Sequence, residues 1–245
     1  MSLRLGFDMD GVVADLNAAL VREALRLFPG VEPRIGAGAS VAPPAPDPDA
    51  PDVDPSELTP ASLPLTRRQE RQLWDEVQQI ENFWETLDET EPGIIQRLAD
   101  LARVRRWETI FLTSRPRTAG DPVQIQSQRW LRAHGFELPS LFVVSTSRGK
   151  IAAALELDVV VDDRPENCLD ITIDSKARAV LIWRGDQGAV PGSARRLGIG
   201  GVASVGACLD LLVEADSPGT DQTSLVERLK RLLRLKTGEP ERARA

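Results

Sequence analysis

The chain has 245 residues, of which 42% are hydrophobic and 27% are charged, and its formal net charge is −7. This length and composition predict one buried core with a smaller appended unit. The negative charge argues against a general nucleic-acid-binding surface, which needs a basic face to neutralise backbone phosphates, and the single histidine, His134, leaves little basis for a multi-histidine metal site or a Ser-His-Asp triad.

The first part of the chain predicts a strand, a helix and then an irregular excursion. Residues 3–7 are apolar enough for a short buried strand that ends in Asp8, and residues 15–28 place apolar side chains on one face of a helix. Residues 30–64 are crowded with Pro, Ala, Asp and Gly, which build neither ladders nor helices, so we expect an extended excursion. Helical periodicity returns at 66–80.

The rest of the chain alternates predicted helices and strands. Helices are expected at 94–102, 121–134 and 149–155, and strands at 109–112, 141–144, 158–161 and 179–183. Because each strand is too apolar to face water, this alternation predicts an α/β fold whose parallel sheet is covered by helices on both faces. Ligands of such sheets bind at the carboxyl ends of the strands. Three of the predicted strands carry polar clusters at these ends.

Two carboxylates, Asp8 and Asp10, follow the first predicted strand. Residues two apart on an extended chain project to the same side, so these two can converge on one point, and Gly11 then allows a sharp turn. Asp162 and Asp163 follow a neighbouring strand and complete an all-oxygen set that suits Mg²⁺. The four carboxylates are therefore the predicted metal site, in which either member of the later pair is the direct ligand.

The same residues suggest phosphoryl transfer. With a cation offsetting the charge of a phosphoryl group, Asp8 can attack phosphorus while Asp10 protonates the leaving oxygen and later activates water. Thr113, Ser114 and Lys150 offer donors and a positive charge to the phosphate oxygens. A lysine near the positive end of a helix is electrostatically misplaced unless an anion lies there, which favours this role for Lys150 over that of a surface residue.

These clusters resemble the four motifs of the haloacid dehalogenase superfamily of phosphatases. The first motif is similar to the run from Asp8 to Val12, the second to Thr113-Ser114, the third-motif lysine to Lys150 and the acidic fourth motif to Asp162-Asp163, all in the family's order. The resemblance covers residues 1–15 and 92 to about 185. It implies a three-layer Rossmann-like parallel sheet with a small, mainly helical cap inserted between the first and second motifs, an aspartyl-phosphate on Asp8, and Mg²⁺ as the cofactor.

Within that superfamily the chain is most similar to the 5′(3′)-deoxyribonucleotidases. The similarity lies in residues 8–15, in the Phe83-Trp84 pair before a Pro-Gly turn, and in residues 162–165. It implies 5′-nucleotidase activity. Phe83 and Trp84 would then stack a nucleobase, with core packing as an equal alternative. Arg115 would contact the substrate or stabilise the loop in which it lies.

The predicted domain organisation follows from the motif positions. Residues 1–15 and 92–215 form the catalytic core, and residues 16–91 form the cap insertion, which contains a Pro-rich stretch at 36–64. Residues 216–245 are expected to form a basic amphipathic helix and tail that docks on the acidic core or on a partner subunit.

The leading interpretation is a Mg²⁺-dependent phosphomonoester hydrolase acting on a small phosphorylated substrate, with a nucleotide favoured. The alternative esters are sugar phosphates and nucleic-acid 3′-phosphate ends. A phospho-accepting signalling domain is the alternative from a different class, but its phosphorylated Asp should lie on a later strand than the acidic pair, whereas Asp8 follows the first strand.

The expected cellular location and partners of the protein follow from features that the sequence lacks. The two cysteines form neither a disulfide framework nor a zinc-ligand spacing. The sequence contains neither a signal-like start nor about 18 consecutive apolar residues. We therefore expect a cytoplasmic protein without membrane contact or stable nucleic-acid binding, and a homodimer is the candidate assembly.

Overall fold

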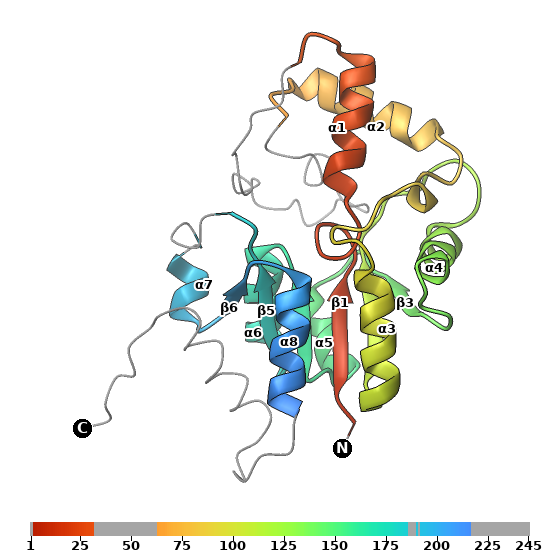
Figure 1. The fold of residues 1–245 in the computed structure, drawn as a ribbon. Helices are drawn as coiled ribbons and strands as arrows, with labels where there is room; N and C mark the ends of the chain where they lie inside the picture. Colours follow the sequence, from red (N-terminus) through yellow and green to blue (C-terminus); the bar gives the residue numbers. More distant parts are fainter. Residues whose placement is uncertain (1, 32–62, 186–189, 191, 217–245) are drawn as a thin grey trace.

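The structure is a computed structural model that describes residues 2–31, 63–185, 190 and 192–216. Within these ranges, six parallel strands form one sheet in the order β3-β2-β1-β4-β5-β6 (Figure 1). The strands are β1 (Arg4–Asp8), β2 (Glu108–Thr113), β3 (Ser140–Val143), β4 (Val159–Asp162), β5 (Arg178–Ile182) and β6 (Gly200–Val202).

Helices cover both faces of the sheet. Successive strand residues point to opposite sides, so apolar strands present an apolar surface on each face that the helices bury. One face, to which Phe111 and Val161 point, packs against α3 (Ile94–Arg105), α4 (Val123–Ala133) and α8 (Val205–Asp216). The opposite face, to which Leu112 and Val160 point, packs against α5 (Arg148–Ala154), α6 (Pro165–Asp174) and α7 (Gly192–Arg196). The predicted α/β class and three-layer Rossmann-like sheet are confirmed.

The five strands predicted from the sequence are all present, and a sixth, β6, was not predicted. Strand β6 has only three residues, two of which are glycines. Glycine has no side chain to pack in a strand and a low strand propensity, so this segment carries no periodic signal. It is recruited as an edge strand by its parallel pairing with β5.

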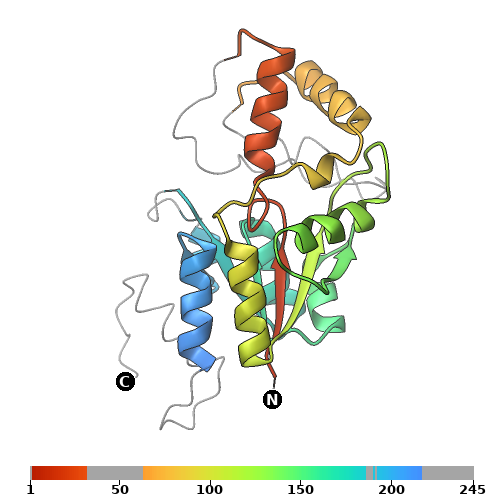
Figure 2. The ribbon, with the colours of Figure 1, turned by 45° about the vertical axis from the view of Figure 1, so that its right-hand side comes forward.

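The segment between β1 and β2 adds helices beyond the carboxyl edge of the sheet. Helices α1 (Leu16–Leu27) and α2 (Arg67–Gln79) pack together there, away from α3 and α8, as Figures 1 and 2 show. Asp15 caps α1 by accepting a hydrogen bond from the Ala18 amide at 2.9 Å. A short 3-10 helix, η2 (Phe83–Glu85), then leads back toward the sheet.

Two parts of the sequence prediction lie outside the described residues. These are most of the Pro-rich stretch 36–64 and the basic amphipathic helix predicted beyond residue 216. Across the ranges that the structure describes, every helix is too short or too polar to cross a membrane.

Candidate active site

Asp8 ends the central strand β1 at the carboxyl edge of the sheet. From β1 the chain proceeds to β2 and β3 on one side, and then crosses to β4 on the other side of β1. Ligands of open parallel sheets bind at such a reversal of strand order. The Asp8 side chain is buried there, with only 7% of the residue exposed. The residue predicted to be the nucleophile therefore lies where this class of fold binds ligands.

A tight loop after Asp8 keeps Asp10 at the same edge of the sheet. Two backbone amides of the loop donate to the Met9 carbonyl at 2.9 and 2.8 Å. Gly11 has a φ of 77°, and a Cβ at this position would lie 2.0 Å from Oδ2 of Asp163. Only glycine therefore allows the loop to turn while the carboxylate of Asp163 lies against it.

The cation that contacts Asp8 is Arg148. Its Nη2 donates to Oδ1 of Asp8 at 2.5 Å, and its Nε lies 3.9 Å from Oδ2 of Asp162. Arg148 is 5% exposed, and its Nη1 is a buried donor without a hydrogen-bond partner among the described residues. A buried, unpaired guanidinium nitrogen is costly. This donor beside Asp8 is therefore a point at which an anion such as a phosphoryl group would be stabilised.

The structure places Lys150, the predicted phosphate ligand, on the exposed side of α5, away from Asp8. Lys150 is exposed, whereas Arg148, two residues earlier in α5, is buried in the site. Successive residues of an α-helix are rotated by about 100°, so positions two apart lie about 200° apart and face nearly opposite directions. With Arg148 facing Asp8, Lys150 therefore faces solvent.

The packing of α5 on α6 decides which cation faces the site. Oδ2 of Asp170 accepts from the Ser147 hydroxyl at 2.7 Å and from the Gly149 amide at 3.0 Å. A Cβ on Gly149 would lie 2.3 Å from the backbone oxygen of Asp170. This close approach fixes the rotation of α5 about its axis, and with it the direction of Arg148.

We expect Gly149→Ala to lower the free energy of unfolding by about 2–3 kcal/mol, because the added methyl group meets backbone that cannot move aside. Urea denaturation measures the change. Gly30→Ala is the matched control, since a Cβ on Gly30 meets nothing within 4 Å. Equal stability of the two variants would contradict the close packing of α5 on α6.

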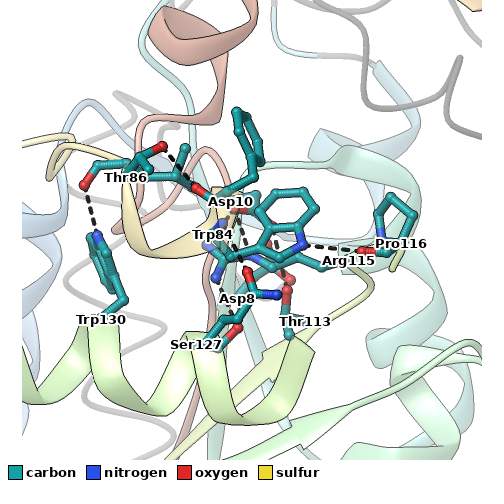
Figure 3. A network of polar contacts seen from close by, with 12 residues as sticks. Asp8, Asp10, Trp84, Thr86, Thr113, Arg115, Pro116, Ser127 and Trp130 are labelled. Carbon is teal, nitrogen blue, oxygen red and sulfur yellow. Dashed lines mark hydrogen bonds and ion pairs between the residues drawn. The ribbon is translucent and has the colours of Figure 1, made fainter. Parts of the chain in front are cut away.

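Asp10 is held by Arg115 and Thr113. Nε of Arg115 lies 3.0 and 2.9 Å from the two carboxylate oxygens of Asp10, and Nη2 lies 2.7 Å from Oδ1 (Figure 3). The hydroxyl of Thr113 donates to Oδ2 at 3.3 Å. Ser114, the other predicted phosphate ligand of this loop, is half-buried. Arg115 therefore binds Asp10, not an open substrate site.

The acidic pair divides into a fully buried and a partly exposed carboxylate. Asp162 is completely buried and accepts hydrogen bonds from the Arg164 amide at 2.9 Å and from Nδ2 of Asn167 at 3.0 and 3.1 Å. Asp163 is partly exposed and lies against Gly11. The two residues therefore have different surroundings: the first is fixed by its own loop and helix, whereas the second meets the loop that carries Asp10.

Burial and mutual repulsion make these carboxylates hard to ionise. Burial raises the pKa of Asp8 well above its usual range; Arg148 opposes this shift, while Asp162, Asp163 and Asp10 add to it. Burial, together with the charge of Asp162, raises the pKa of Asp163 to about 7. Burial also raises the pKa of Asp162. The end of the sheet is thus a place where additional positive charge would be stabilised.

The predicted four-carboxylate metal cluster is not gathered in this arrangement. Among the described residues, no three acidic, His or Cys side chains lie close enough together to hold one ion. Asp8 and Asp10 are each paired with an arginine, Arg148 and Arg115 respectively. The donor set still fits a hard cation, since it offers only oxygen atoms and its carboxylates repel one another. Asp8, Asp10 and one of the pair Asp162 and Asp163 would hold Mg²⁺, which would supply positive charge to a bound phosphoryl group.

We expect Asp163→Asn to stabilise the metal-free protein by about 1–2 kcal/mol at pH 8, a discounted figure because Asp163 is partly exposed. In the folded wild type the pKa of Asp163 is raised from 3.8 to about 7, so the folded state favours the neutral carboxyl group. The wild type is therefore destabilised as the pH rises from about 4 through about 7, whereas the variant has no carboxyl group at this position to ionise. Urea denaturation in EDTA across this pH range measures the difference. Added Mg²⁺ should stabilise the wild type more than the variant; identical pH profiles would contradict the prediction.

Phe83 and Trp84 are buried, and the structure favours the core-packing alternative over nucleobase stacking. Phe83 is 2% exposed and Trp84 is fully buried, with their rings edge to face at a centroid distance of 5.1 Å. The Trp84 ring lies 4.7 Å from Cζ of Arg115, and its Nε1 donates to the Pro116 carbonyl at 3.0 Å (Figure 3). Neither ring is available to a base in this arrangement.

Three residues of the site were not predicted from the sequence: Arg148, Asn167 and Ser127. Arg148 carried a signal in the sequence, since it is basic and directly precedes the helix predicted at 149–155, two residues before Lys150. Asn167 and Ser127 lie within α6 and α4 and reach the site only because those helices pack beside it. Nothing in their local sequence marks them.

The fold and site together define an α/β protein with a three-layer Rossmann-like sheet and two aspartate–arginine pairs at its strand-order reversal. No protein-family model matches the sequence, and no curated protein matches it. Among solved structures, the chain is similar to the crystal structure of a "putative beta-phosphoglucomutase" from Thermotoga maritima, with a TM-score of 0.51 and 16% identity over 86% of this chain and 99% of that chain. At this identity the similarity shows a shared fold.

Proposed function

We propose that the protein is a phosphomonoester hydrolase of the haloacid dehalogenase type, which forms an aspartyl-phosphate on Asp8 and uses Mg²⁺. The observation that carries the proposal is the buried pair of Asp8 and Arg148 at the carboxyl end of β1, with one guanidinium nitrogen left without a partner. Such a pair combines a nucleophile with a donor for a phosphate oxygen. The position of Asp8 on the first strand supports this over a phospho-accepting signalling domain.

The chemistry would proceed in two steps. Arg148 holds Oδ1 of Asp8, which leaves Oδ2 to attack phosphorus; as the new P–O bond forms, the ester P–O bond breaks and the leaving oxygen takes a proton from Asp10. A water molecule then attacks the same phosphorus and gives its proton to Asp10, and the bond to Asp8 breaks. Inorganic phosphate and an alcohol are the products.

The substrate class has two candidates. The resemblance of residues 8–15 and 162–165 to deoxyribonucleotidases favours a nucleoside monophosphate. The burial of Phe83 and Trp84 removes the aromatic contact expected for a base and favours a sugar phosphate as the second candidate. The protein of similar fold is also named for a sugar-phosphate activity.

A screen of phosphate release across nucleoside monophosphates, sugar phosphates and 3′-phosphorylated oligonucleotides, with Mg²⁺ and with EDTA, tests both the reaction and the substrate. Phosphate release that requires Mg²⁺ is expected. Preference for a sugar phosphate would replace the nucleotidase assignment. Absence of release from every ester, p-nitrophenyl phosphate included, would overturn the proposed function.

A further inference from the structure

Three partners surround Arg115 and hold its guanidinium group in a single orientation. One edge, Nε and Nη2, binds both carboxylate oxygens of Asp10, and Nη1 donates to Oγ of Ser127 at 2.9 Å. One face stacks on the Trp84 ring at 4.7 Å. The Arg115 side chain has no exposed surface in this arrangement.

The three partners come from separate parts of the fold. Asp10 lies after β1, Ser127 lies in α4, and Trp84 lies in η2, on the segment between β1 and β2. Trp84 is itself fixed, since its amide donates to Oε1 of Gln126 at 3.1 Å and its indole donates to the Pro116 carbonyl. The position of Arg115 is therefore set jointly by the sheet, by α4 and by the inserted segment.

A planar guanidinium held at one end and on one face can present its remaining edge in only one direction. The carboxylate bound to that edge is then fixed in position and in rotation about its own bond, as bidentate pairs require. We infer that Arg115 is a positioning residue for Asp10, held in place by Ser127 and by the Trp84 ring. The inference rests on the proposed function and replaces the role of substrate contact predicted for Arg115.

The second step of the reaction depends on the placement of the Asp10 carboxylate. There the water oxygen forms a bond to phosphorus, its proton goes to a carboxylate oxygen of Asp10, and the bond from phosphorus to Asp8 breaks. Misplacing a catalytic group by about 1 Å can cost about 100-fold in rate. A p-nitrophenyl leaving group needs little help from an acid, so the first step should survive a displaced Asp10 while the second step slows.

The test is rapid-mixing kinetics of p-nitrophenyl phosphate hydrolysis in Mg²⁺ by the full chain. We expect Arg115→Met to lower kcat about 100-fold without raising KM, and to release one p-nitrophenol per site in a burst before slow turnover. Arg115→Lys, which keeps the charge, should lose about 10-fold and still show the burst. Arg117→Met is the matched control, because Arg117 is exposed in the same loop, and it should equal the wild type.

Coupling to Asp10 is measured with Asp10→Asn and the double variant Asp10→Asn with Arg115→Met. If Arg115 acts through Asp10, the double variant turns over no more slowly than Asp10→Asn alone. A raised KM without a burst, or additive losses in the double variant, would overturn the inference, because a substrate contact or a purely structural role gives these results. A wild type that hydrolyses no phosphate ester overturns the proposed function itself.

Discussion

Asp8→Asn is expected to abolish turnover, lowering kcat at least about 1,000-fold, and to prevent labelling of the protein by substrate phosphate. The amide cannot attack phosphorus as a carboxylate oxygen does, and Asp8 is the carboxylate that ends β1 and accepts the hydrogen bond from Nη2 of Arg148. Acid quenching of the wild type during turnover of radiolabelled substrate should trap a phosphoprotein that the variant does not form.

Two controls accompany this substitution. Asp100→Asn changes an exposed aspartate on α3 in the same way and should retain full activity. Because Asp8→Asn leaves the buried Arg148 without its anionic partner, circular dichroism and urea denaturation must show that the variant is folded. Activity that survives in a folded Asp8→Asn variant would refute the aspartyl-phosphate mechanism.

The second large effect is expected from the contrast between Arg148 and Lys150. Arg148→Met should lower kcat/KM by about 100 to 1,000-fold, because it removes the cation that faces Asp8 and the buried donor beside it. Lys150→Met should stay within about two-fold of the wild type, since an exposed side chain on the opposite side of α5 has no contact with the site. Steady-state kinetics on the best ester from the screen measure both.

Arg148→Met and Lys150→Met each remove one positive charge from the same helical turn. A difference in kcat/KM between them therefore reports the position of the charge and not the net charge. Arg148→Lys should recover part of the activity, because it restores a charge without the guanidinium geometry. A loss in Lys150→Met as large as that in Arg148→Met would show that α5 adopts the other rotation in solution.

Much of this arrangement was determined by the sequence itself. Alternating apolar strands and amphipathic helices predict the parallel sheet, and a parallel sheet brings the carboxyl ends of its strands to one edge. Asp8, Thr113 and Asp162 each end a strand, so their convergence needs only the strand assignments and the order of the sheet. Asp10 follows from the same logic, since it lies two residues beyond Asp8.

Only the tertiary structure decided which side chains contact one another at that edge. A helical pattern in sequence does not state how the helix is rotated against its neighbours; the contact of Gly149 with α6 sets that rotation and selects Arg148 over Lys150. Likewise, the sequence around Trp84 is equally consistent with stacking on a ligand and with packing in the core. The packing of η2 against α4 and the contact of Arg115 with the ring place Trp84 in the core. Side-chain direction depends on long-range packing, which a local sequence pattern does not contain.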